Sequence, residues 1–302
     1  MPDMVEPRFE AGRYVLDWGA GRIEIDPVTG GRVTALYLDL DLDGGNLLTG
    51  PDVDAGNYGS TFWPAPQAAW GWPPLAEVDH GPYQVIRAAD ALVLNGASNP
   101  ALSVSIDKRI AADRARGAVV FDFSINNHGA VPVQLAPWQI TRVPSGGLTF
   151  FPTGSGNFAP SNLAVREQGG VTWYAYDRAA ITEHQKLFAD GSEGWLAHAN
   201  VGAGTLLVKT FDVVARAEQA PGEAQIEIYA SPAHTYVEVE VQGPYGTIAP
   251  GAVLAWRVVW LARKLPAGMV PAAGSAALLA FVRGVVEADR AAAAAAPSAA
   301  PA

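Results

Sequence analysis

Apolar and polar residues alternate along most of the chain, which is the pattern of half-buried β-strands. The segments that alternate most clearly are 22–26, 33–42, 118–126, 205–211, 224–230 and 236–242. Glycine and proline pairs, such as Gly44-Gly45 and Pro221-Gly222, punctuate these runs. Strands at short intervals bounded by turns predict an all-β fold, a large antiparallel sandwich.

A helical pattern occurs only near the end of the chain, roughly from Ala272 to Arg290. The alanine-rich tail beyond it has no amphipathic stripe and contains two prolines, so we expect it to be disordered. No repeat or change of composition interrupts the chain before the helix. The predicted organisation is a sandwich domain over residues 10–266, a helical appendix over 267–290 and a disordered tail over 291–302.

Composition narrows the ligand classes. Hydrophobic residues make up 49% of the 302 residues, charged residues only 17%, and the net charge is −10. Nucleic acid and anionic membrane would be repelled by such a chain at long range, so we expect neither as a partner. A small-molecule ligand that is neutral or locally recognised fits better.

The chain has no cysteine, which excludes disulfides, thiol nucleophiles and cysteine metal sites. Its five histidines show no metal-binding spacing, and no glycine-rich phosphate loop is present, so we expect no metal and no cofactor. The N-terminal segment lacks the features of a signal peptide, which predicts a cytoplasmic protein. A start placed further upstream would instead permit a periplasmic location.

Residues 57–74 are unusually aromatic, with three tryptophans and four prolines in 18 residues. The prolines prevent regular strand pairing, so this segment should be a stiff loop or an irregular edge. Flat indole faces stack on sugar rings, and amides bind ring hydroxyls. The candidate ligand-binding residues are Asn57, Trp63, Gln67, Trp70 and Trp72. The alternative is a loop that its own aromatic residues pin to the core.

Trp138 and Gln139 again place an indole beside an amide, at the end of a predicted strand. They are further binding candidates, although burial of the tryptophan at a strand end explains the pattern equally well. Lys186 is a lone cation in an apolar context, as are Arg142 and Lys209. Each could hold an acidic group of a sugar or simply pair with a carboxylate of the protein.

Glu238 and Glu240 lie on one face of the alternating segment 236–242, with valines on the other. Their backbone positions are about 6–7 Å apart, given the rise of a strand. Like charges so close raise at least one pKa when the face is enclosed, and such a carboxylate can act as a general base. A solvated strand face, on which the glutamates do nothing, is the alternative.

Four segments of the sequence are similar to a known group of proteins. They are INNHGAVPVQLAPWQIT (125–141), YVEVEVQGPYGTIAPG (236–251), FWPAPQ (62–67) and GWLAHANVGAGTLLVKTF (194–211). Over about residues 12–265 the chain resembles the galactose-mutarotase-like (aldose 1-epimerase) superfamily. It is most similar to an uncharacterised bacterial branch with a domain of unknown function.

The resemblance implies a β-supersandwich that binds sugars in the cleft of a large sheet and interconverts their anomers. In the family a glutamate takes the anomeric proton and a histidine protonates the ring oxygen. Glu240 falls on the glutamate position, but Pro137-Trp138 falls on the histidine position. General-acid catalysis contributes about 10²–10⁴-fold. Either another group supplies the proton, with His80, His184 and Lys186 as candidates, or the cleft binds without turnover.

Three hypotheses therefore stay open. The chain is a carbohydrate-binding, epimerase-like protein, an active sugar mutarotase or epimerase with Glu240 as general base, or a non-catalytic protein-interaction module. A concave pocket lined by the tryptophans would favour the first two, whereas a flat aromatic surface would favour the third.

Overall fold

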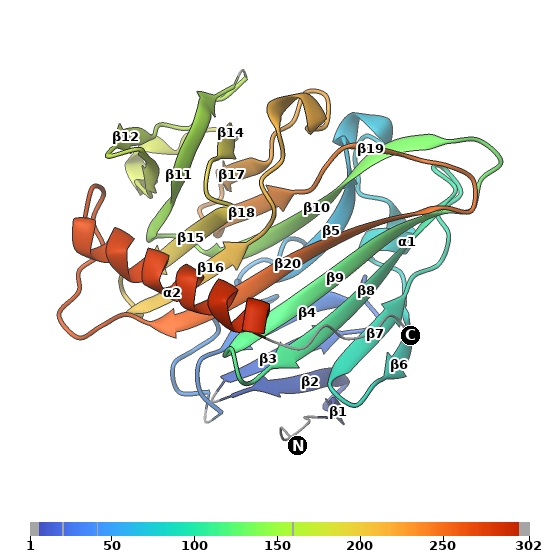
Figure 1. Ribbon diagram of the computed structural model, residues 1–302, viewed down its shortest axis with the longest axis horizontal. Helices are drawn as coiled ribbons and strands as arrows, with labels where there is room; N and C mark the ends of the chain where they lie inside the picture. The colour runs from blue at the N-terminus through green and yellow to red at the C-terminus, as the bar shows by residue number, and fades with distance from the viewer. Residues whose placement is uncertain (1–5, 20, 41, 159, 296–302) are drawn as a thin grey trace.

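The computed structural model describes residues 6–19, 21–40, 42–158 and 160–295, and its strands form two large antiparallel sheets (Figure 1). The first sheet has the order β1 (Arg8–Glu10), β2 (Arg13–Trp18), β3 (Gly21–Asp26), β4 (Arg32–Tyr37), β5 (Ser60–Ala65), β10 (Val133–Pro144), β18 (Tyr236–Gln242), β17 (Ile226–Ala230) and β14 (Gln185–Gly191). The predicted antiparallel all-β fold is confirmed.

The second sheet has the order β6 (Gln84–Arg87), β7 (Ala91–Asn95), β8 (Val104–Asp113), β9 (Ala118–Asn127), β20 (Val253–Lys264), β16 (Thr205–Thr210), β15 (Trp195–Asn200), β11 (Leu148–Asn157), β13 (Val171–Ala175) and β12 (Arg166–Gln168). The far end of β11 also pairs with β14, which joins the two sheets. A short strand, β19 (Gly246–Ile248), pairs with the beginning of β10. The short helical segments are α1 (Ala76–Asp79), η1 (Gln67–Ala69), η2 (Arg178–Ala180) and η3 (Arg216–Glu218).

The main core lies between the two sheets and is formed by the apolar residues that alternate with polar ones along the strands. In β18, Val237, Val239 and Val241 are at most 2% exposed and face this core, whereas the glutamates between them face the other way. Trp260 of β20 belongs to the same core from the second sheet, and its indole Nε1 donates to Gln139 Oε1 at 2.9 Å. The face of the first sheet that turns away from this core carries the polar groups described below.

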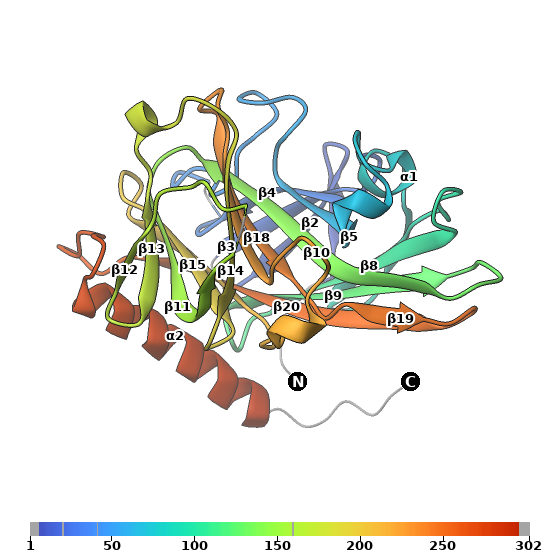
Figure 2. The same ribbon diagram turned by 90° about the horizontal axis from the view of Figure 1, so that it is seen from above.

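The C-terminal helix α2 (Ala276–Ala295) lies along the outer side of the second sheet (Figure 2). Leu278, Val282 and Val286 follow at intervals of one turn and pack into a second apolar cluster with residues of that sheet. Ion pairs of Arg116 with Asp289 and of Arg283 with Glu193 fasten the helix at two further points. None of the helices in the described part of the chain is apolar over enough of its length to cross a membrane.

The expectation that the proline-rich segment 57–74 is a stiff loop or an irregular edge is wrong for its first half. Residues Ser60–Ala65 form β5, which lies between β4 and β10 and pairs with β10 in continuous register, with Pro64 opposite Pro137.

Two boundaries also differ from those expected. The segment 33–42 alternates throughout, but β4 ends at Tyr37 and the chain then turns. The helix continues to Ala295, so residues 291–295 of the expected tail are helical, because alanine has the highest helix propensity even where it is exposed. The rest of that tail, residues 296–302, lies outside the described residues.

Candidate functional site

Five adjacent strands, β5, β10, β18, β17 and β14, present a polar and aromatic face on the side of the first sheet that is turned away from the core. Their registers bring together residues distant in sequence. Trp138 pairs with Trp63, and Arg142 pairs with Glu238. Glu238 in turn pairs with Tyr229, and Tyr229 pairs with Lys186. Because paired residues share a sheet face, strand pairing alone gathers these side chains into one site.

The site is a cavity of about 350 Å³, at the small end of the range for ligand pockets, which is about 300–1,000 Å³. Its wall is mostly aromatic and amide-bearing, with a few charged groups. The lining residues are Asn57, Trp63, Gln67, Trp72, Trp138, Arg142, His184, Lys186, Tyr229, Tyr236 and Glu238. A cavity of this composition and size suits a small polar ring.

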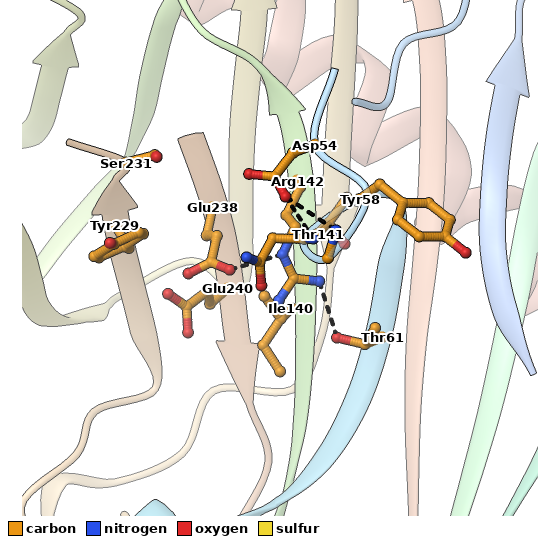
Figure 3. Close-up of polar contacts among 12 residues, drawn as sticks. Asp54, Tyr58, Thr61, Ile140, Thr141, Arg142, Tyr229, Ser231, Glu238 and Glu240 are labelled. Carbon is orange, nitrogen blue, oxygen red and sulfur yellow. Dashed lines mark hydrogen bonds and ion pairs between the residues drawn. The ribbon is translucent and has the colours of Figure 1, made fainter. Parts of the chain in front are cut away.

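Arg142 and Glu238 form a buried ion pair within this wall (Figure 3). The Arg142 Nε lies 2.9 Å from Glu238 Oε1, and its Nη1 donates to Thr61 Oγ1 at 3.3 Å. The guanidinium also lies 5.5 Å from the ring centre of Trp63 and 5.9 Å from that of Tyr236. Ionic, hydrogen-bonding and cation–π contacts thus fix the arginine in one orientation.

Lys186 forms a second charged group with two more deeply buried glutamates. Its Nζ lies 2.6 Å from Glu227 Oε2 and 3.1 Å from Glu240 Oε2. The same Glu240 oxygen accepts the indole N–H of Trp138 at 2.9 Å, and the ammonium lies 5.0 Å from the centre of the Trp138 ring. Trp138 and Lys186 therefore lie between Glu240 and the cavity.

The enclosure of these groups shifts their pKa values. Burial, reinforced by the charge of Glu240, raises the pKa of Glu238 to about 7 although Arg142 opposes the shift. Burial likewise raises the pKa of Glu227 to about 8. Burial lowers the pKa of Lys186, but the charges of Glu227 and Glu240 outweigh it and raise that pKa above its usual value. Near neutral pH, this site therefore holds protons on carboxyl groups that would be ionised in water.

The rim of the cavity offers aromatic surface and a hydrogen-bonded pair. Trp72 is 65% exposed and meets the edge of Trp63 at 6.3 Å between ring centres. Just before β14, Nδ1 of His184 lies 2.5 Å from the hydroxyl oxygen of Tyr229 on the adjacent strand β17. Burial raises the pKa of Tyr229 to about 12, so its hydroxyl keeps its proton near neutral pH.

Seven of the ten residues proposed from the sequence line this cavity: Asn57, Trp63, Gln67, Trp72, Trp138, Lys186 and Glu238. Three do not. Trp70 supports the loop from behind, because its indole donates to Pro64 O at 2.7 Å. Gln139 faces the core, because neighbouring residues of a strand point to opposite faces and Trp138 occupies the cavity face.

Glu240 is the third, since its side chain is fully buried behind Trp138 and Lys186. Glu238, two residues earlier, is the glutamate that reaches the cavity. His80, a candidate proton donor, lies elsewhere with its Nδ1 2.7 Å from Asp79 Oδ2. His184, another candidate, is at the rim.

The sequence proposals omitted Tyr229, Tyr236 and Glu227 from the site and treated Arg142 only as a lone cation. The alternation of 236–242 places Tyr236 beside the glutamates, so that signal was present in the sequence. Glu227 and Tyr229 join the site only through the pairing of β17 with β18, which no local pattern reveals. Among the described residues, no group of three or more histidine or acidic side chains is arranged to hold a metal ion.

Solved structures with the same architecture identify the class of fold. A galactose mutarotase-like protein from Lactobacillus casei matches with a TM-score of 0.57 and 11% identity, over 83% of this chain and 100% of its own. A putative aldose 1-epimerase from Escherichia coli matches with a TM-score of 0.54 and 12% identity, over 84% and 99%. A TPR-domain containing protein from Parabacteroides distasonis matches with a TM-score of 0.57 and 15% identity, over 86% of this chain and 49% of its own. This chain thus spans about half the length of that last protein.

The fold is therefore galactose mutarotase-like, as the sequence resemblance implied. More specifically, residues 45–263 match the family described as "Domain of unknown function (DUF4380)", and the chain belongs to that family. No curated protein matches the sequence.

Proposed function

We propose that this protein binds a carbohydrate in the cavity formed by β5, β10, β18, β17 and β14. The observation that carries the proposal is the make-up of the wall, in which tryptophan and tyrosine rings alternate with amide and charged groups around about 350 Å³. Aromatic faces take the apolar C–H surface of a sugar ring, and the polar groups between them take its hydroxyls. The galactose mutarotase-like fold is consistent with such a ligand.

A second candidate function is sugar anomer interconversion, which the pairing of a carboxylate with a separate donor in one cavity favours. Glu238 would accept the proton of the anomeric hydroxyl while the C1–O5 bond breaks and the ring oxygen takes a proton from the His184–Tyr229 pair. After rotation about C1–C2, the reverse transfers close the ring on its other face. A pKa of about 7 for Glu238 suits a general base at neutral pH.

In this scheme Glu240 does not touch the ligand, because Trp138 and Lys186 lie between them, and it acts only through these two side chains. It holds the indole N–H and the ammonium in place and adds negative charge behind Glu238. Glu240 is thus proposed as a positioning residue, and Glu238 takes the catalytic role that the sequence assigned to Glu240.

The third hypothesis, a protein-interaction module, receives less support. It requires the tryptophans of segment 57–74 to form a flat exposed surface, yet Trp63 of β5 and Trp72 line a cavity and Trp70 packs behind them. A concave aromatic wall is typical of small-molecule sites.

Saturation-transfer NMR against a panel of free monosaccharides and disaccharides tests the proposal. We expect at least one sugar to receive saturation, with a weaker signal in Trp72→Ala. Anomer-exchange NMR on that sugar then separates the candidates: acceleration that disappears in Glu238→Gln supports the isomerase, and binding without acceleration supports a binding protein. If no sugar in the panel binds, the proposed function is wrong.

A further inference from the structure

The wall behind the cavity has an excess of carboxyl groups. Glu227, Glu238 and Glu240 have side chains that are 1%, 12% and 0% exposed, and only two cations, Arg142 and Lys186, contact them among the described residues. A fourth carboxyl, Glu223, adjoins this group through Gln242, whose Nε2 donates to both Glu223 and Glu227. The four carboxyls outnumber the two cations, and the cluster holds protons near neutral pH in place of a full negative charge.

Both cations already contact these carboxyls. Arg142 contacts Glu238 through Nε and Thr61 through Nη1, and the ammonium of Lys186 bridges Glu227 and Glu240. An acidic group on a ligand would have to share Arg142, whose Nη2 has no partner among the described residues, with Glu238, and its charge would lie beside that of the glutamates. Like charges so close make the ionised form of such a group less favourable.

Glu238 instead has a carboxylate oxygen that a positively charged ligand group could contact. Its Oε1 faces Arg142, whereas no described residue donates a hydrogen bond to its Oε2, and the side chain lines the cavity. The exposed ring of Trp72 and the half-buried ring of Tyr229 present π surface to the same cavity. A carboxylate oxygen without a donor beside aromatic faces is a favourable environment for an ammonium group.

Resting on the proposed function, we infer that the cavity prefers sugars that carry a protonated amino group, and that it disfavours acidic sugars. The amino group donates to Glu238 Oε2 and lies against the aromatic wall, while the ring hydroxyls meet Asn57 and Gln67. The ligand's positive charge then favours the ionised form of Glu238 and takes the place of the proton that this carboxyl group partly holds near neutral pH.

Binding constants measured calorimetrically at pH 7 for matched sugars test this inference. The probes are glucose and galactose, their 2-amino-, 3-amino- and 6-amino-deoxy forms, the N-acetylated form of each amino sugar, and the uronic acids. We expect one amino sugar to bind about tenfold more tightly than its neutral parent, the difference between a charge-assisted and a neutral hydrogen bond. N-acetylation should abolish the gain, and the uronic acids should bind more weakly than the neutral sugars.

Glu238→Gln should bring the affinity for the amino sugar to about that of the neutral parent, with both affinities measured in the same variant. Glu167→Gln removes the same charge from an exposed position on β12 and should leave the preference intact, which controls for the overall acidity of the chain. Neutral sugars that bind as well as amino sugars, or uronic acids that bind best, would overturn the inference and leave the proposed function standing. Failure of every sugar to bind would instead overturn the proposed function.

Discussion

Replacing Lys186 by methionine keeps the aliphatic stem but removes the ammonium that lies 2.6 Å from Glu227 and 3.1 Å from Glu240. Removing one partner of a buried ion pair costs about 3–5 kcal/mol, whereas an exposed pair contributes about 0–1 kcal/mol. The carboxyls are at most 1% exposed and the lysine side chain is 23% exposed, so the lower end of the buried range applies. We expect a loss of about 3 kcal/mol of unfolding free energy at pH 9.

The loss should depend on pH. At pH 5 Glu227, whose pKa burial raises to about 8, is already protonated and needs no counter-charge, so only Glu240 then loses a partner and we expect a smaller loss than at pH 9. Urea denaturation followed by tryptophan fluorescence at both pH values measures the difference. The double variant Lys186→Met/Glu227→Gln should recover part of the loss at pH 9. An equal loss at both pH values, or no recovery in the double variant, would show that the ammonium does not act by charge compensation.

Four further predictions concern single side chains. The folded state holds a proton on Glu227 that the unfolded state releases above a pKa of about 4.5. Stability should therefore fall between pH 5 and pH 8, by up to about 1.4 kcal/mol per pH unit for one proton. Glu227→Gln should make stability less dependent on pH in this range, and an unchanged dependence would argue against a protonated Glu227. Trp72→Ala should weaken sugar binding about tenfold with little change in Tm, since the indole is 65% exposed; a large drop in Tm would mean that the ring is structural. Gln139→Leu leaves the Trp260 indole N–H unpaired and should cost about 1–3 kcal/mol without weakening sugar binding, so a loss of binding at full stability contradicts the core-facing assignment. Leu278→Ala should cost about 2–5 kcal/mol if α2 is an integral part of the second apolar cluster, whereas denaturation curves that overlay the wild type would show that the helix contributes little.

The fold was largely predictable because its strands are half-buried and alternate. The valines and glutamates of 236–242 indicate by their order alone which face packs into the core, and the face assigned to Glu238 and Glu240 is the one observed. The same rule separates Trp138 from Gln139, since adjacent residues of a strand cannot share a face. Applying it to both segments would have kept Gln139 out of the site.

Strand pairing explains what the sequence could not supply. Glu227 and Tyr229 reach the site because β17 pairs with β18, and Lys186 because β14 pairs with β17. The sequence also does not show how deeply each glutamate is buried. The two glutamates of β18 share a face, but Trp138 and Lys186 cover only Glu240. Which carboxylate meets a ligand is thus decided by side chains from other strands.

A crystal structure with the tightest-binding sugar of the panel tests the central claim most directly. The account predicts the ring against Trp72 and Tyr229, with a ligand nitrogen or oxygen within hydrogen-bonding distance of Glu238 Oε2. A sugar seated on another surface, with this cavity unchanged, would contradict it.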